Sequence, residues 1–415
     1  MSDPTAVAYP DILKARDVLK GQTIVSHCEQ SHTLSSILGC DVFLKCENLQ
    51  FTSSFKERGA FNRLAALSTT ERKSGIIAMS AGNHALGVAY HAGRMGVPTT
   101  IVVPLGTPTI KVENTRRFGA EVIVHGSTLE EASDYAHTRA QNLGLTFIHP
   151  YDDPLVIAGQ GTIACEMLEQ VHNLDVIVVP IGGGGLAAGV AIAAKALRPQ
   201  IRIVGIQASL YPSMYNVIKG TALPNHGDTL AEGIAVKTPG ILTQRIIRQL
   251  VDDIQLVDEV MLERAVSILI NIEKTVVEGA GAAGLAAILA SPQRFAKQRV
   301  ATVLCGGNID MRLLASVLTR DLARDGRLSR LAIDLVDQPG RLAEVTRLLG
   351  EQRANIVEVA HQRVFTDLPA KAALLDVVIE TRDRRHRNET IAVLRHAGFH
   401  VVCEVPESAE NLDEN

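Results

Sequence analysis

A lysine at the expected start of a helix is the first residue that could do chemistry. The stretch TSSFKERGA covers residues 52–60, and apolar residues then recur at helical spacing. Ser54 and Glu57 stand three residues apart, as in a capping box, which places Lys56 in the first helical turn. The helix dipole and the charge of Arg58 would both lower the pKa of the Lys56 amine. The stretch therefore predicts a nucleophilic amine, with a solvated lysine as the alternative.

A run of glycines predicts an anion site. IGGGGLAAG, residues 181–189, follows a strand-like run and opens a helix-like one. Backbone N–H groups can converge on an anion at such a point, and here they belong to a glycine loop made of Gly182, Gly183, Gly184 and Gly185. A ligand-free tight turn is one alternative, and a dinucleotide site is another. The dinucleotide site needs an acid at the end of the next strand, where this chain has Gln207, so a lone phosphate is the better ligand.

Three other motifs bring polar groups to loops. SAGNHALG, residues 80–87, follows a strand and could bind a carboxylate, with His84 structural when taken alone. LCGGNID offers the uncharged thiol of Cys305, which could instead be a plain core residue. VVEGAGAAG places Glu278 before small residues, where an acid can also be a helix cap.

These groups together call for a ligand with a phosphate, a carbonyl that condenses with an amine, and a ring with a heteroatom. Pyridoxal 5'-phosphate has all three, and its enzymes need a Schiff-base lysine. Lys56 is suited to be that lysine. The sequence therefore predicts an enzyme that uses pyridoxal phosphate.

Parallel sheets would place these loops side by side. Between about residues 40 and 305, short β-rich runs alternate with helix-like segments, which predicts an α/β fold with parallel sheets covered by helices. Ligands bind in such folds at the carboxyl ends of the strands, and the glycine-rich motifs are expected there. The predicted strands are residues 42–46, 76–80, 99–104, 121–125, 175–180, 201–207 and 300–305.

A second domain is expected after a polar link near residue 325. Two helix-like and four strand-like segments follow in the order βαββαβ, which predicts a ferredoxin-like plan. The chain would then comprise a catalytic domain, a smaller domain and an acidic tail that is expected to fray. Their ranges are 1–325, 326–406 and 407–415.

Composition argues against several classes of protein. The net charge of −4 gives no basic surface for nucleic acid. Residues 176–194 carry no charge, but Pro180 and five glycines interrupt them, which favours a buried strand, a glycine loop and a helix over a membrane span. The amino terminus lacks a signal-peptide pattern, and the six cysteines form neither a CxxC pair nor a zinc spacing. We therefore expect a cytoplasmic protein without nucleic-acid or membrane partners.

Five motifs in order resemble those of the fold-type II pyridoxal-phosphate enzymes, in particular the serine/threonine dehydratase family. They are SSFKERGA, SAGNHALG, GGGGL, EGAGA and CGGNID, and the resemblance covers about residues 5–322. It implies a tryptophan synthase β-like fold of two subdomains, with the smaller one inserted at about residues 52–145. It also implies conversion of L-threonine to 2-oxobutanoate and ammonia, with L-serine to pyruvate as a side activity.

The resemblance implies a role for each matching residue. Lys56 would form the Schiff base, Phe55 would pack against the cofactor ring, and Asn83 would bond its phenolic oxygen. Cys305, where many relatives have serine, would face the ring nitrogen, and Glu278 would border the cofactor. The glycine loop would hold the phosphate. The substrate carboxylate would be held by Ser80, Ala81, Gly82, Asn83 and His84.

Two departures separate this chain from some of these relatives. Serine racemases of this fold have a second serine at the position of Ala81, so efficient racemisation is not expected. The segment QASLYPSM, residues 207–214, lacks the acids that bind a divalent cation in the racemases and some dehydratases, so no tight magnesium site is expected, while a monovalent cation is left open. A racemase-like or β-replacement enzyme and, from another class, a non-catalytic amino-acid sensor are the alternatives.

The last domain resembles an ACT domain through its DQPGRL turn and NIVEV strand. ACT domains bind amino acids, which implies allosteric control by a branched-chain amino acid such as isoleucine or valine. The effector contacts would come from Gly340, Leu342 and Asn355. A small oligomerisation domain is the alternative, and the family implies a homodimer or homotetramer.

Overall fold

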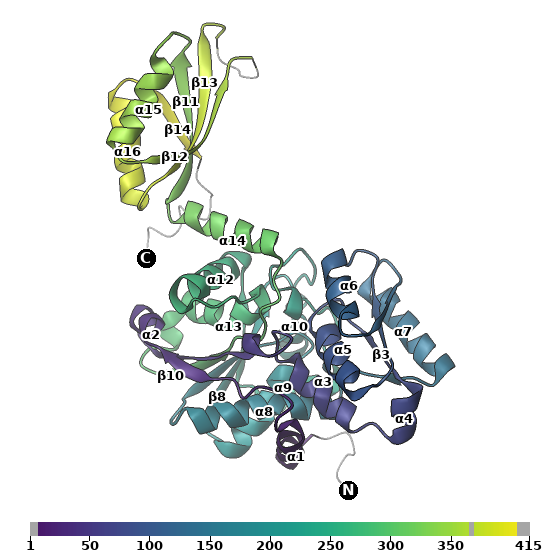
Figure 1. Cartoon of the computed structure of the whole chain (residues 1–415). Helices are drawn as coiled ribbons and strands as arrows, with labels where there is room; N and C mark the ends of the chain where they lie inside the picture. The colour runs from purple at the N-terminus through teal and green to yellow at the C-terminus, as the bar shows by residue number, and fades with distance from the viewer. Residues whose placement is uncertain (1–6, 365–368, 405–415) are drawn as a thin grey trace. The chain divides into compact units, whose positions relative to one another are not determined.

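The computed structural model describes residues 7–364 and 369–404, which fold into two compact units (Figure 1). The units are Met1–Ile309 and Asp310–Asn415. The boundary lies earlier than the expected position near residue 325. Helix α14, Met311–Arg324, belongs to the second unit because it packs on that unit's first strand, β11 (Leu328–Val336).

The larger sheet of the first unit confirms the predicted parallel α/β fold. Five of its six strands are parallel, and only β1 runs antiparallel to its neighbour. Two strands of this sheet, β1 and β9, were not predicted because both are short and contain several polar residues. In sheet order the strands are β1 (Cys28–Ser31), β2 (Asp41–Lys45), β10 (Arg299–Val303), β7 (Val176–Pro180), β8 (Arg202–Ala208) and β9 (Asp253–Val257).

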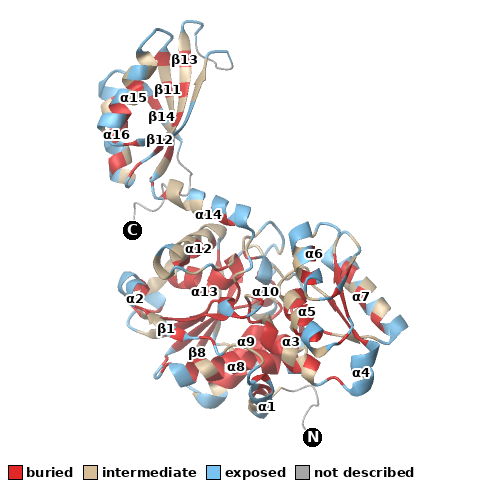
Figure 2. Ribbon diagram, viewed as in Figure 1, coloured by how far each residue is buried: buried red, intermediate tan, exposed pale blue. Residues whose placement is uncertain are grey.

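Small residues let helices pack closely on this sheet. Figure 2 shows α8 and α9 buried over most of their length. A Cβ atom on Gly189 of α9 would lie 2.4 Å from the carbonyl oxygen of Ile157 on α8, so a larger residue would force the two helices apart. The helices of this subdomain are α1 (Tyr9–Leu19), α2 (His32–Leu38), α8 (Pro154–Gln170), α9 (Gly185–Leu197), α10 (Ser213–Lys219), α11 (Ile241–Leu250), α12 (Glu259–Glu273) and α13 (Gly279–Ala290), with short 3-10 turns η1 (Glu47–Leu49), η2 (Glu232–Ile234) and η3 (Pro292–Arg294).

A smaller, fully parallel sheet forms the second subdomain. Its strand order is β5 (Glu121–Val124), β4 (Thr99–Val103), β3 (Ile76–Met79) and β6 (Thr146–Phe147). Apolar residues of α3 and α5 pack with the strands into one core. These elements lie between residues 56 and 147, against an expected range of about 52–145. The helices are α3 (Lys56–Ala65), α4 (Thr69–Ser74), α5 (Asn83–Met95), α6 (Thr109–Arg116) and α7 (Leu129–Leu143).

The second unit has the predicted ferredoxin-like order. Its antiparallel sheet runs β12-β13-β11-β14, and α15 and α16 share one apolar core with its strands. The elements after β11 are α15 (Arg341–Glu351), β12 (Asn355–Gln362), β13 (Ala372–Glu380), α16 (Arg384–His396) and β14 (His400–Glu404). The expected acidic tail, 407–415, lies outside the described residues. Among the described residues, no helix combines the length and apolar character that crossing a membrane requires.

Candidate active site

Lys56 is the first residue of helix α3, which starts later than the sequence predicts. Its Nζ donates a hydrogen bond to the carbonyl oxygen of Pro150 at 2.8 Å. The predicted capping box is wrong, because the cap position is Phe55 and the Ser54 side chain caps nothing. Glu57 instead accepts the backbone N–H of Thr52. Lys56 therefore lies at the positive end of the helix dipole, as expected.

Desolvation gives Lys56 a reactive amine. Burial lowers the pKa of this half-buried side chain to about 8, while Cys305 and Glu278 act in the opposite direction. The predicted influence of Arg58 is wrong. Its buried guanidinium is instead paired with carboxylates, and the ion pairs are Arg58–Glu47 at 2.7 Å and Arg58–Glu166 at 2.5 Å.

The loop after β10 pairs with the residues just before Lys56. The backbone N–H of Phe55 donates to the carbonyl oxygen of Cys305 at 3.1 Å, and Ser54 forms an antiparallel bridge with Gly306. Burial raises the pKa of the Cys305 thiol well above its usual range, so this thiol stays neutral. The ring of Phe55 lies 5.2 Å from the Lys56 amine. Two strand-end loops thus bring an amine and a neutral thiol together.

Asn83 and Glu278 form a polar pair beside these residues. Asn83 begins α5, and its Nδ2 donates to Glu278 Oε1 at 2.7 Å. Burial raises the pKa of the Glu278 carboxyl to about 7 against the hydrogen bond from Asn83. The expectation that every glycine-rich motif follows a strand is wrong for VVEGAGAAG, the motif that contains Glu278. This motif follows a helix, α12, and continues into the next helix, α13. A Cβ atom on Gly306 would lie 2.2 Å from Glu278 Oε1, so the pair needs a glycine at this position.

Asn308 is a site residue to which the sequence interpretation gave no role. Its Nδ2 donates to the Asn83 Oδ1 and to the carbonyl oxygen of Thr52, both at 2.8 Å. The side chain therefore links the loop after β10 to the start of α5 and to the segment before Lys56. The position of Asn308 within the motif CGGNID is the sequence signal that could have identified it.

The glycine loop lies between β7 and α9 and has no room for side chains. Gly184 has φ +99°, and a Cβ atom there would lie 2.8 Å from Thr243 Cβ. A Cβ atom on Gly183 would lie 2.3 Å from the ring of Tyr151, the residue after the Lys56 acceptor Pro150. Thr243 Oγ1 donates to the carbonyl oxygen of Gly183 at 2.7 Å. Sequence reasoning missed Tyr151 and Thr243 because they reach the loop from distant parts of the chain.

The loop after β3 leads into α5 and contains the residues predicted to bind a carboxylate. Its residues from Ser80 to Asn83 are half-buried, and the backbone N–H of Gly82 donates to the Ser80 hydroxyl at 3.2 Å. His84 is buried, with its Nε2 3.0 Å from the carbonyl oxygen of Ile148. Burial lowers the pKa of His84 to about 3, so the ring is neutral and packs as a structural group.

The residues present fit pyridoxal phosphate. A partly neutral amine, a neutral buried thiol and a glycine loop with space only for backbone would suit its aldehyde, ring nitrogen and phosphate, respectively. In the part of the chain that the structure describes, no group of three or more His, Cys, Asp or Glu side chains could hold a metal ion.

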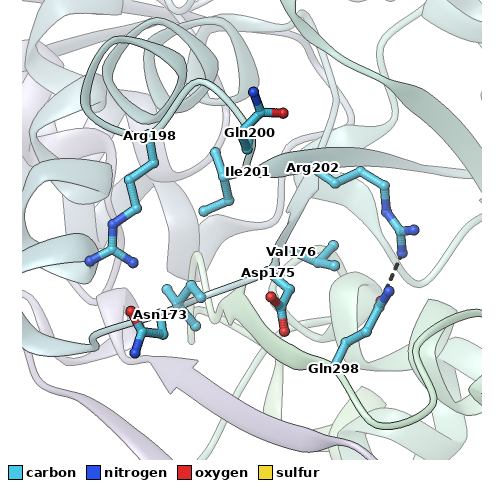
Figure 3. A pocket seen from close by; sticks show the side chains of 9 residues that line it. Asn173, Asp175, Val176, Arg198, Gln200, Ile201, Arg202 and Gln298 are labelled. Atoms are coloured by element: carbon cyan, nitrogen blue, oxygen red, sulfur yellow. Dashed lines mark hydrogen bonds between the residues drawn. The ribbon is translucent and has the colours of Figure 1, made fainter.

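A separate cavity of about 470 Å³ lies away from this chemistry (Figure 3). It is lined by residues at the amino ends of β7 and β8, whereas the glycine loop and Cys305 follow the carboxyl ends of strands. Arg198 and Arg202 lie on opposite sides of it, and Arg202 donates to Gln298 at 3.0 Å. The cavity therefore does not belong to the candidate active site.

Comparison with known proteins identifies the protein family to which the chain belongs. Residues 20–306 match the family model described as "Pyridoxal-phosphate dependent enzyme". The chain therefore belongs to the family of pyridoxal-phosphate-dependent enzymes, as the motifs and the paired parallel sheets predicted.

Individual relatives show which enzymes of this family the chain resembles. The chain is 40% identical to the L-threonine ammonia-lyase of Thermotoga maritima over 95% of this chain and 99% of that protein. The processed threonine deaminase isoform 2 of Solanum lycopersicum is 34% identical, with a TM-score of 0.70 over 75% of this chain and 92% of its own. Maize serine racemase is 33% identical, with a TM-score of 0.71 over 76% of this chain and 98% of its own. Within the family the chain thus groups with the threonine ammonia-lyases, also called threonine dehydratases.

The residues expected to bind an effector do not meet within one chain. Gly340 caps the start of α15 with φ +92°, and Leu342 lies in the first turn of that helix. Asn355 begins β12, beyond the other end of α15. An eleven-residue helix is about 16 Å long, so Asn355 is far from the first two residues.

Proposed function

We propose that this chain is an L-threonine dehydratase that uses pyridoxal 5'-phosphate and releases 2-oxobutanoate and ammonia. The observation that carries the proposal is the amine of Lys56, which has a pKa near 8 and lies beside the neutral thiol of Cys305. Identity to a named threonine ammonia-lyase along nearly the whole chain supports the same reaction. L-serine is the expected second substrate.

In this proposal the residues around Lys56 hold the cofactor. Lys56 would hold its aldehyde, Phe55 would pack on its ring, Asn83 would donate to its phenolic oxygen, and the glycine loop would hold its phosphate. When bound, pyridoxal phosphate withdraws electrons from the substrate Cα. The neutral thiol of Cys305 would leave the ring nitrogen unprotonated, and Glu278 would border the site with a carboxyl that titrates near neutral pH.

The substrate would be held by its carboxylate and deprotonated by Lys56. The backbone from Ser80 to His84 lies at the amino end of α5, where N–H groups and the helix dipole favour an anion. The Lys56 amine would be the base for the α-proton, and a pKa near 8 keeps a usable fraction of it neutral. The β-hydroxyl would take up one proton, which balances the proton lost from Cα, and leave as water. Hydrolysis of the released imine would then give 2-oxobutanoate and ammonia.

Product analysis with threonine or serine as the sole amino acid tests this proposal. The holoprotein should release 2-oxobutanoate and ammonia in equal amounts from threonine, and pyruvate from serine. A β-replacement enzyme would need an added nucleophile, and a racemase would form the D-amino acid, which Ala81 disfavours. A non-catalytic sensor would form no oxoacid and would be colourless. Absence of oxoacid from both substrates would reject the proposal.

We also propose that the second unit is an ACT domain that binds a branched-chain amino acid. Its ferredoxin-like order and the capping Gly340 before α15 support this assignment. Gly340 and Leu342 could share an effector with Asn355 only if two copies of the chain supply them, which favours a homodimer or homotetramer. Six unpaired cysteines support a cytoplasmic location.

A further inference from the structure

We propose that Glu57 is a positioning residue that fixes the turn leading into Lys56. The proposal rests on the proposed function, because it concerns how Lys56 is presented to the cofactor. Glu57 directly follows Lys56 on α3, and its side chain has no exposed surface. An acid at such a position needs a reason, because burying a carboxylate costs free energy unless partners compensate.

The partner of Glu57 is the backbone at the start of the turn. The N–H of Thr52 donates to Glu57 Oε1, closing a loop of six residues around Lys56. Thr52 is itself buried, so without Glu57 its N–H would lose its acceptor in a dry environment. The carboxylate therefore ties the chain entering the turn to the helix that leaves it.

The turn needs such restraint because its backbone is strained. Ser53 has φ +56°, a left-handed conformation that residues other than glycine rarely adopt. Strain of this kind persists only where the surroundings fix it. Further bonds act on neighbouring groups: Gly307 N–H donates to the Ser53 carbonyl oxygen at 2.9 Å, and Asn308 donates to the Thr52 carbonyl oxygen.

A buried histidine faces the far side of the carboxylate without forming a hydrogen bond to it. His91 of α5 has no exposed surface, and its Nε2 lies 3.4 Å from Glu57 Oε2. A Cβ atom on Gly87 of α5 would lie 3.3 Å from the Lys56 carbonyl carbon, so the two helices touch at this point. Glu57 is thus bonded to the turn before Lys56 and packs against α5, the helix that also carries Asn83 and His84.

Substituting Glu57 by leucine tests the proposal. Glu57→Leu keeps a buried side chain but removes the acceptor for Thr52. We expect cofactor affinity and kcat for threonine each to fall about tenfold, the cost of one unpaired buried donor. The threonine KM should change less than about threefold, because the carboxylate-binding loop at Ser80 is untouched. The visible band that reports cofactor bound to Lys56 should shift or form more slowly.

Two variants separate positioning from stability. Glu57→Gln keeps an oxygen that can accept from Thr52, so it should restore most of the affinity and turnover. Glu71→Leu removes the same kind of bond elsewhere in the subdomain, where Glu71 Oε2 accepts the N–H of Ser68 at 2.7 Å. It should lower Tm without changing the cofactor band or its affinity.

The outcomes distinguish this inference from the proposed function. Wild-type affinity, band and kcat in Glu57→Leu would overturn the inference, as would losses no larger than those of Glu71→Leu. If Glu57→Leu does not fold, hydrogen exchange at the Thr52 amide of the wild-type holoprotein decides: strong protection supports the bond, and rapid exchange overturns it. A wild-type chain that binds no pyridoxal phosphate would reject the proposed function and this inference together.

Discussion

At the residue scale, the properties of Lys56 arise from its surroundings more than from its neighbours in the sequence. The sequence located the amine and the sign of its pKa shift, but it named Arg58 as a cause, and Arg58 is instead held by Glu47 and Glu166. The main cause is burial, which depends on segments far from residue 56. A motif can identify a reactive side chain, whereas its desolvation is a property of the folded chain.

Burial of Lys56 predicts that Lys56→Met stabilises the cofactor-free protein. The folded amine titrates near pH 8 and the free amine near 10.5. Below pH 8 the amine is protonated in both the folded and the unfolded protein. The folded state then bears the full free-energy cost of burying the charge, about 2 kcal/mol after allowing for residual solvent contact. Between these pH values the unfolded state binds more protons, so wild-type stability rises with pH and the advantage of the variant shrinks.

Urea unfolding at several pH values measures this effect. Lys73→Met is the control, because Lys73 is an exposed lysine of α4 and should change stability little at any pH. A Lys56→Met variant that is less stable than wild type at pH 7, or whose advantage grows above pH 8, would contradict the assigned burial.

The proposed position of Cys305 leads to a prediction about the ratio of elimination to racemisation and transamination. Its neutral thiol should leave the ring nitrogen unprotonated, whereas Cys305→Asp would place an acid there and strengthen the ring as an electron sink. Racemisation and transamination should then rise relative to elimination, with kcat for elimination falling about tenfold or more. Chiral chromatography of the products measures this, and Cys305→Ser, with a neutral hydroxyl, should keep the wild-type ratio. An unchanged ratio in the aspartate variant would remove Cys305 from the ring nitrogen.

At the element scale, parallel strands gather loops that are distant in sequence. Apolar runs predicted the strands that carry these loops, and the motifs at residues 80–87, 181–189 and 304–310 predicted three of the loops that follow them. Tyr151 and Thr243 escaped prediction because each contacts the glycine loop only after folding. The start of α3 was misjudged because Glu57 bonds to Thr52, which precedes the expected cap, Ser54, by two residues.

The lack of space around the glycine loop predicts that a substitution there weakens cofactor binding and lowers stability. Gly184→Ala would add a Cβ atom 2.8 Å from Thr243 Cβ on a backbone with φ +99°. We expect cofactor affinity to fall about tenfold and stability by about 1–3 kcal/mol. Gly220→Ala is the matched control, because Gly220 also has positive φ but nothing lies within 4 Å of its added Cβ. Fluorescence titration should show wild-type affinity for the control, and equal effects of both substitutions would contradict a phosphate-binding loop.

At the scale of the whole molecule, the two proposed roles, chemistry and effector binding, belong to separate units. The family match at residues 20–306 lies entirely within the first unit, which also holds the loops of the candidate active site. The ferredoxin-like order of the second unit was predictable because its alternating strands and amphipathic helices are regular. The start of this unit was not, because α14 continues the helical pattern before the expected link.

This division predicts the effect of removing residues 310–415. Threonine turnover should persist, while any response to isoleucine or valine should be lost, because coupling requires an effector site. Steady-state kinetics with and without these amino acids measures the response, and light scattering measures the mass. A truncated protein that still responds would place the effector site in the first unit. A change of mass with no effector response in the full chain would support an oligomerisation domain.

Borohydride reduction of the holoprotein followed by peptide mapping tests the central claim most directly. The reagent fixes a bond between a lysine and the cofactor aldehyde, and we predict one reduced adduct per chain, located on Lys56. An adduct on another lysine, or no adduct in a protein that converts threonine, would contradict the account.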